Sequence, residues 1–112
     1  MVAPFAFASA AEILFGRGQA ANAAARVVGL GQRVLLVHGR NPDRAAWLAD
    51  GLRAQGCEVV GFAVPREPDT DLVAQGIRTA QGAQVVVALG GGAVIDAGKA
   101  IAALVPATRP ML

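Results

Sequence analysis

The chain has 112 residues, enough for one domain with one modest hydrophobic core. Hydrophobic residues make up 54% of the sequence and charged residues 16%, a balance typical of a folded globular chain and not of a disordered one. The formal net charge is only +2, and the basic residues are scattered along the chain. This distribution argues against a nucleic-acid partner, because nucleic-acid-binding proteins usually gather basic residues on one face.

The composition also bears on the redox state and the location of the protein. Cys57 is the only cysteine in this sequence, which excludes a disulfide framework or a cysteine-held metal cluster within it. No apolar run is long enough to span a bilayer, so we expect no membrane partner. The apolar segment from Met1 to Ala11 lacks the basic residues of a signal peptide. These features predict a cytoplasmic location.

The first half of the chain predicts extended segments, a helix and a buried strand. Phe5-Ala6-Phe7 and Ile13-Leu14-Phe15 are two short extended pieces that could pair with each other. An alanine-rich stretch from Gln19 to Leu30 predicts a helix that ends among glycines. The aliphatic run from Val34 to His38 then predicts a buried strand.

Two further helices are predicted from their capping residues. Asn41 is the expected N-cap of the first, with Pro42 at its first helical position and Gly56 after its end. Asp69 or Thr70 is the expected cap of the second. Each helix has an apolar face; the expected members are Ala45, Leu48, Ala49 and Leu52 in the first helix and Leu72, Val73, Ile77 and Ala80 in the second.

Strands at Val59 to Val64 and Val85 to Leu89 alternate with these helices. This alternation predicts βαβ units with right-handed crossovers, and therefore an α/β fold with a Rossmann-like parallel sheet and flanking helices. Ligands of such sheets bind beyond the carboxyl ends of the strands. We therefore expect Gly39-Arg40, Glu67 and Gly90 to Gly92 to converge on one crevice.

The glycine turn after the last predicted strand favours a pyrophosphate site. The first amides of the helix after it have no partner within the helix, the helix dipole favours an anion, and glycines let the ligand approach the backbone. The expected donors are the amides of five residues, Gly91, Gly92, Ala93, Val94 and Ile95. The alternative is a tight strand–helix turn with no ligand. The usual dinucleotide fingerprint follows the first strand, and this turn does not.

At these residues the chain resembles the iron-containing (group III) alcohol dehydrogenases. The family carries Gly-Gly-Gly-Ser-x-x-Asp-x-x-Lys after a buried strand, and Gly90 to Lys99 follows this motif, with Ala93 in place of the serine. Phe15-Gly16-Arg17-Gly18 is similar to the Phe-Gly-x-Gly segment of the family, and Val64 to Asp69 lies where the family has a proline-rich turn. The resemblance spans residues 5 to 105. Dehydroquinate synthases and glycerol dehydrogenases share the fold and remain alternatives.

The resemblance implies that residues 1–112 form a single NAD(P)-binding domain of this fold, without the helical metal-binding domain that follows it in the family. It further implies that full-length relatives exchange a hydride between NAD(P) and an alcohol or its carbonyl, assisted by a divalent metal, Fe or Zn. The missing domain would hold the metal, since this sequence has a single histidine, His38, which we interpret as a strand-end residue. By itself the chain is predicted to bind nucleotide without turnover.

The resemblance places Gly39 beside the adenosine ribose of the cofactor. NAD-preferring relatives often carry an aspartate there, whereas this chain has glycine followed by Arg40. Because guanidinium groups bind phosphates well, we expect a preference for NADP, or a relaxed preference between NADP and NAD. The alternative for Arg40 is a solvated surface residue.

Asp96 has two interpretations. It could complement the dipole at the helix start, or, by the family motif, face the nicotinamide. Lys99 could pair with it along the helix, and Gly98 predicts close packing of that helix.

Three alternatives to a dehydrogenase domain also remain open. The chain could be a non-catalytic nucleotide-binding module, half of a split enzyme completed by a C-terminal domain or partner chain, or a truncated remnant. The sequence leaves open the substrate, the metal and whether the chain forms a homo-oligomer.

Overall fold

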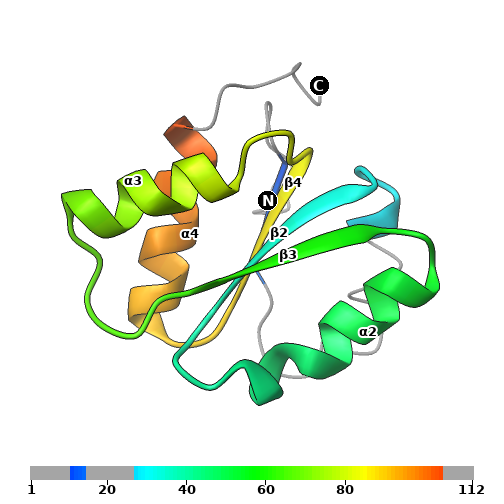
Figure 1. Ribbon diagram of the computed structural model, residues 1–112, viewed down its shortest axis with the longest axis horizontal. Coiled ribbons are helices and arrows are strands. Elements are labelled where there is room, and N and C mark those ends of the chain that lie inside the picture. Colours follow the sequence, from blue (N-terminus) through cyan, green and yellow to red (C-terminus); the bar gives the residue numbers. More distant parts are fainter. Residues whose placement is uncertain (1–10, 15–26, 105–112) are drawn as a thin grey trace, which may run out of the picture.

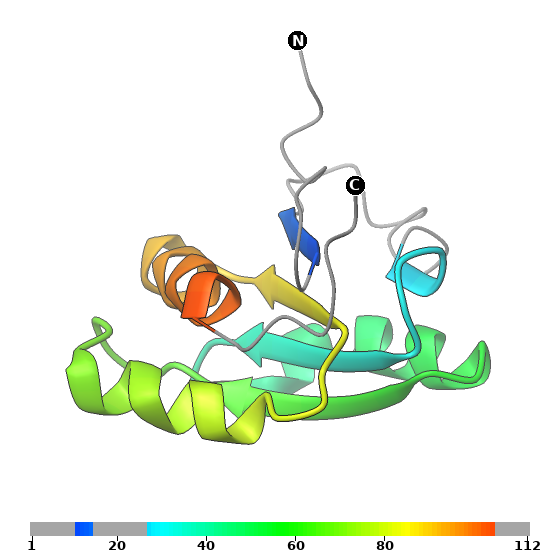
Figure 2. The same cartoon turned by 90° about the horizontal axis from the view of Figure 1, so that it is seen from above.

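The computed structural model describes residues 11–14 and 27–104. Four strands, β1 (Ala11–Leu14), β2 (Arg33–His38), β3 (Glu58–Ala63) and β4 (Val85–Leu89), form one sheet in the order β1-β4-β2-β3. All neighbouring strands are parallel, and β1 and β3 lie at the two edges (Figure 2). The predicted α/β fold with a parallel sheet is confirmed.

Helices cover both faces of the sheet (Figure 1). On one face lie α3 (Thr70–Thr79) and α4 (Gly92–Leu104), and on the other lies α2 (Ala46–Ala54). The two central strands, β2 and β4, are buried on both faces, which explains their uninterrupted aliphatic sequences. None of the helices in the described part of the chain is long and apolar enough to cross a membrane.

The N-terminal strand has a partner that the sequence prediction did not name. Ile13 and Leu14 belong to β1, which pairs in parallel with β4. Phe5-Ala6-Phe7 and most of the predicted helix from Gln19 to Leu30 lie outside the described residues. Pairing with β4 extends a larger sheet, whereas an isolated two-stranded ladder is marginally stable in water.

Asn41 caps the first predicted helix, as expected. Its side-chain oxygen accepts a hydrogen bond from the Asp43 amide at 3.0 Å. The first turn after it is a separate 3-10 segment, η1 (Pro42–Ala45), and α2 continues from there. The chain leaves α2 at Gly56, whose φ of 91° is a conformation that favours glycine.

Asp69, and not Thr70, is the N-cap of α3. Its carboxylate accepts a hydrogen bond from the Leu72 amide at 2.8 Å. This hydrogen bond, together with the nearby Arg66 guanidinium, lowers the pKa of the Asp69 carboxyl. The cap therefore favours the ionised carboxylate.

The predicted close packing at Gly98 is confirmed. A Cβ at this position of α4 would lie 2.7 Å from the Cβ of Ala88 in β4, closer than two carbon atoms can approach. The glycine thus lets α4 lie directly on the strand that precedes it.

We expect Gly98→Ala to lower the free energy of unfolding by about 1–2 kcal/mol, because the cost of overpacking exceeds the gain in helix propensity. Chemical denaturation measures the change. Adding Ala88→Gly to this variant removes the clash, so a double-mutant cycle should give a favourable coupling of about 1 kcal/mol. Additive effects of the two substitutions would contradict the contact.

The Asp69 cap predicts a pH dependence. Asp69→Asn retains a capping oxygen but cannot titrate. Because folding lowers the pKa of Asp69, its carboxylate stabilises the fold fully above its unfolded pKa, and this stabilisation is lost as the pH falls through the folded pKa. The wild-type chain should therefore lose more of its free energy of unfolding than Asp69→Asn between about pH 6 and about pH 2.5. Urea denaturation at both pH values tests this, and equal losses would show that the cap does not titrate as described.

Candidate functional site

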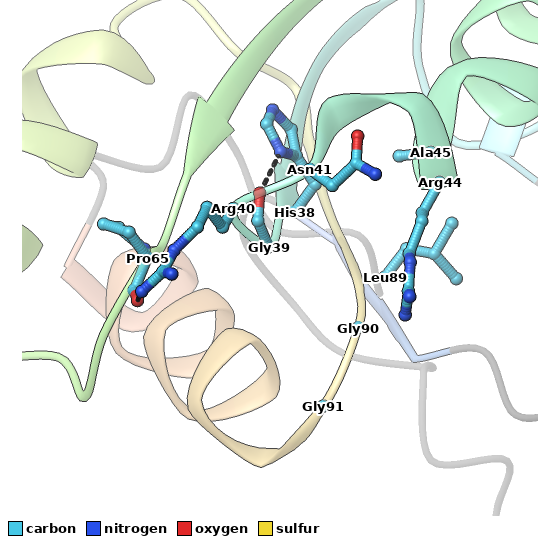
Figure 3. A pocket seen from close by; sticks show the side chains of 10 residues that line it. All are labelled: His38, Gly39, Arg40, Asn41, Arg44, Ala45, Pro65, Leu89, Gly90 and Gly91. Carbon is cyan, nitrogen blue, oxygen red and sulfur yellow. Dashed lines mark hydrogen bonds between the residues drawn. The ribbon is translucent and has the colours of Figure 1, made fainter.

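A cleft of about 440 Å³ opens at the carboxyl edge of the sheet, where β2 and β4 end (Figure 3). The residues that line it come from the turn after β2, the turn after β4 and one position after β3; they are His38, Gly39, Arg40, Asn41, Arg44, Ala45, Pro65, Leu89, Gly90 and Gly91. The structure thus brings Gly39 and Arg40 together with the glycine turn, as the sequence predicts. Glu67 is not among these lining residues. From the connection after β3, Pro65 lines the cleft instead.

The three glycines of the turn differ in what surrounds them. A Cβ on Gly90 would lie 2.8 Å from Cγ2 of Val94, so packing within the chain requires glycine there. A Cβ on Gly91 or Gly92 would meet no atom of the described residues within 4 Å. None of the three has the positive φ that favours glycine. Within the part of the chain that the structure describes, neither packing nor backbone conformation therefore explains glycine at positions 91 and 92.

Three amides at the start of α4 have no acceptor within the described residues. The Gly91 carbonyl accepts the first hydrogen bond of the helix, from the Ile95 amide at 3.0 Å. In the described part of the chain, no hydrogen bond engages the amides of Gly92, Ala93 and Val94. The expectation of a free donor at Ile95 is wrong, because the helix itself uses that amide.

Val94 sets the distance between the two turns of the cleft. Its Cγ2 atom lies 2.8 Å from the Cβ that Gly90 would carry, and 3.8 Å from the one that Gly39 would carry. The Val94 side chain is buried, so it fills the space between the ends of β2 and β4. It therefore contributes both packing and a backbone amide to this edge.

Two arginines leave the turn after β2 in opposite directions (Figure 3). Arg40 extends toward Pro65, and its Nη2 atom donates a hydrogen bond to the Pro65 carbonyl at 3.2 Å. Arg44 extends toward the end of β4 and the glycine turn. Sequence reasoning missed Arg44, although the predicted cap at Asn41 offered a signal, since a residue three positions after a cap lies in the first turn beside the strand end.

His38 supports the turn between β2 and η1. Its Nδ1 atom lies 2.7 Å from the Gly39 carbonyl oxygen, so the Nδ1–H tautomer donates a hydrogen bond to it. This agrees with the interpretation of His38 as a strand-end residue. Among the described residues, no group of three or more histidine, cysteine, aspartate or glutamate side chains could hold a metal ion.

Asp96 and its neighbours do not enter the cleft. Asp96 is the fifth residue of α4 and is exposed, so it lies beyond the first turn, where a carboxylate would complement the helix dipole. At this position the carboxylate lies farther from the helix start than that interpretation requires. The possible ion pair with Lys99 is not formed, since Arg66–Asp69 at 3.5 Å is the ion pair found between residues of the described segments. Cys57 is buried before β3, and burial raises the pKa of its thiol.

Comparisons with known proteins identify the family of this chain. The family model for iron-containing alcohol dehydrogenase matches residues 10–111. Two crystal structures of an archaeal halo-thermophilic Red Sea brine pool alcohol dehydrogenase, one of a point mutant and one bound to NZQ, are similar to this chain. Each has 31% sequence identity and a TM-score of 0.67, and the match covers 90% of this chain and 27% of that one.

The search of curated proteins found no match. The chain spans about a quarter of the length of the solved structures it resembles. The family match itself covers nearly all of the 112 residues. This chain belongs to the iron-containing alcohol dehydrogenase family.

Proposed function

We propose that this chain is the dinucleotide-binding part of an NAD(P)-dependent alcohol dehydrogenase and that it binds the cofactor in the cleft between β2 and β4. The observation that carries the proposal is the start of α4. There, Gly91 and Gly92 adjoin open space, and the next amides have no acceptor among the described residues. A pyrophosphate matches these features, since it needs several donors and a close approach to the backbone.

The electrostatics of the cleft favour an anionic ligand. Two arginines, Arg40 and Arg44, line it, and none of the described residues that line it is acidic. The dipole of the thirteen-residue helix α4 adds positive potential at the glycine turn. Replacement of the family serine by Ala93 removes a hydroxyl but leaves the backbone donors in place.

The turn after β2 supports a preference for NADP over NAD. Gly39 stands where NAD-preferring relatives often carry a carboxylate that binds the ribose hydroxyls. No carboxylate stands among the described residues that line the cleft, so none of them would accept a hydrogen bond from the ribose hydroxyls as in an NAD site or repel a 2′-phosphate. Nearby guanidinium groups favour that phosphate instead.

The bound dinucleotide supplies the hydride acceptor for alcohol oxidation. The described residues do not fit the family metal, because they hold no cluster of metal-binding side chains. We therefore assign binding and orientation of the cofactor to residues 1–112 as one domain, and no metal-dependent step to them. Turnover requires metal-binding side chains from a helical domain or a partner chain. We place the protein in the cytoplasm.

Calorimetric titration of the 112-residue chain with NADP+ and NAD+ tests the proposal. Gly91→Val places a branched side chain in the open space, so its affinity for both nucleotides should fall about tenfold or more, which corresponds to about 1.4 kcal/mol. The melting temperature should stay unchanged, since a Cβ at this position meets no atom of the described residues within 4 Å.

Two further variants serve as controls. Ala103→Val introduces the same valine side chain at an exposed position of α4 far from the turn and should bind as wild type. Gly90→Ala should instead lower the melting temperature, because its Cβ would meet Val94. Failure of the wild-type chain to bind either nucleotide would refute the proposed function. Unchanged binding by Gly91→Val would refute the pyrophosphate placement.

A further inference from the structure

We propose that Arg44 is the specificity-determining residue of the cleft and that it binds the 2′-phosphate of NADP, whereas Arg40 serves the fold. This inference rests on the proposed function, since it assigns one residue to one phosphate of the same ligand. The sequence alone points to Arg40, which directly follows Gly39. The geometry of the two side chains points to Arg44.

Arg40 is already engaged within the protein. Its Nη2 atom donates to the Pro65 carbonyl at 3.2 Å, which ties the turn after β2 to the connection after β3. Figure 3 shows its guanidinium beside Pro65, at the far side of the turn from Leu89. A contact with the cofactor would compete with this hydrogen bond.

The guanidinium of Arg44 donates no hydrogen bond to any described residue. It is exposed, lines the cleft, and makes no side-chain hydrogen bond or ion pair with any described residue. In Figure 3 its guanidinium extends toward Leu89 and the glycine turn. The five N–H groups of a guanidinium can bind two phosphate oxygens at once.

The backbone around Arg44 is held in place. The Arg44 amide donates to the Asn41 carbonyl at 3.3 Å, and the next residue, Ala45, is buried against the core on the α2 face. The neighbouring carboxylate, Asp43, lines a different cavity, between α2 and the sheet, and does not line this cleft. The backbone that carries Arg44 is therefore fixed, and Arg44 forms no ion pair with Asp43.

The position of Arg44 favours the 2′-phosphate over the pyrophosphate. The glycine turn, with Gly90 and Gly91 in the cleft lining, leads from the β4 side into the free amides of α4, whereas Arg44 comes from the β2 side, together with Gly39. A Cβ on Gly39 would have only Val94 nearby, at 3.8 Å, so glycine leaves room for a ribose substituent there. Arg44 then occupies the side of the cleft where NAD and NADP differ.

Calorimetric titration of Arg44→Gln, Arg40→Gln and Arg78→Gln with NADP+ and NAD+ tests the assignment. Arg44→Gln should lose about tenfold in affinity for NADP+ and keep its affinity for NAD+. Arg78→Gln removes the same charge from the exposed surface of α3, away from the cleft, and should change neither affinity appreciably. Arg44→Lys retains the charge without the planar donors and should bind NADP+ with intermediate affinity.

Adenosine 2′,5′-bisphosphate and adenosine 5′-monophosphate give an independent reading, since both lack the pyrophosphate. The first should lose affinity for Arg44→Gln, and the second should not. An equal loss for NADP+ and NAD+, or a selective loss in Arg40→Gln, would overturn the assignment. If the wild-type chain binds both nucleotides and Arg44→Gln binds them unchanged, only this inference fails. If the wild-type chain binds neither, the proposed function fails with it.

Discussion

The close contact between α4 and β4 is the constraint on which the cleft depends. Gly98 lets the helix lie directly on Ala88, and Gly90 makes room for Val94 at the start of the same helix. Both contacts hold α4 against the strand that precedes it, so the first turn of the helix can begin only at the carboxyl edge of the sheet. Because β2 is parallel to β4 and beside it, the turn after β2 opens at this edge too.

The glycines of this chain therefore have two different uses. Gly90 and Gly98 accommodate atoms of the protein, and a side chain at either position would disturb the packing. Gly91 and Gly92 accommodate nothing in the described part of the chain, which is why we assign them to the cofactor. The same residue type thus stabilises the fold at some positions and leaves space for a ligand at others.

Local features of the fold were predictable from the sequence. The caps at Asn41 and Asp69 depend on hydrogen bonds to residues two or three positions away, and the aliphatic runs of β2 and β4 indicate burial directly. The partner of β1 was not predictable, because strand pairing depends on which sheet edge is open.

The site was predictable in part. Its glycine turn and the position of Gly39 follow from motif and topology, whereas the directions of Arg40 and Arg44 depend on packing around the turn. The mistaken donor at Ile95 depended on the residue at which the helix begins. A shift of a single residue in a helix boundary decides whether an amide is free, and sequence patterns do not fix such boundaries that closely.

The most direct test of the account is the response of individual backbone amides to the cofactor. Two-dimensional proton–nitrogen NMR spectra of the chain, recorded during titration with NADP+, would report on each amide. The account predicts that the amides of Gly92, Ala93 and Val94 shift most and that Ile95 shifts less, because its proton stays in the helix. Shifts confined to the opposite edge of the sheet, or to the cavity between α2 and the sheet, would contradict the account.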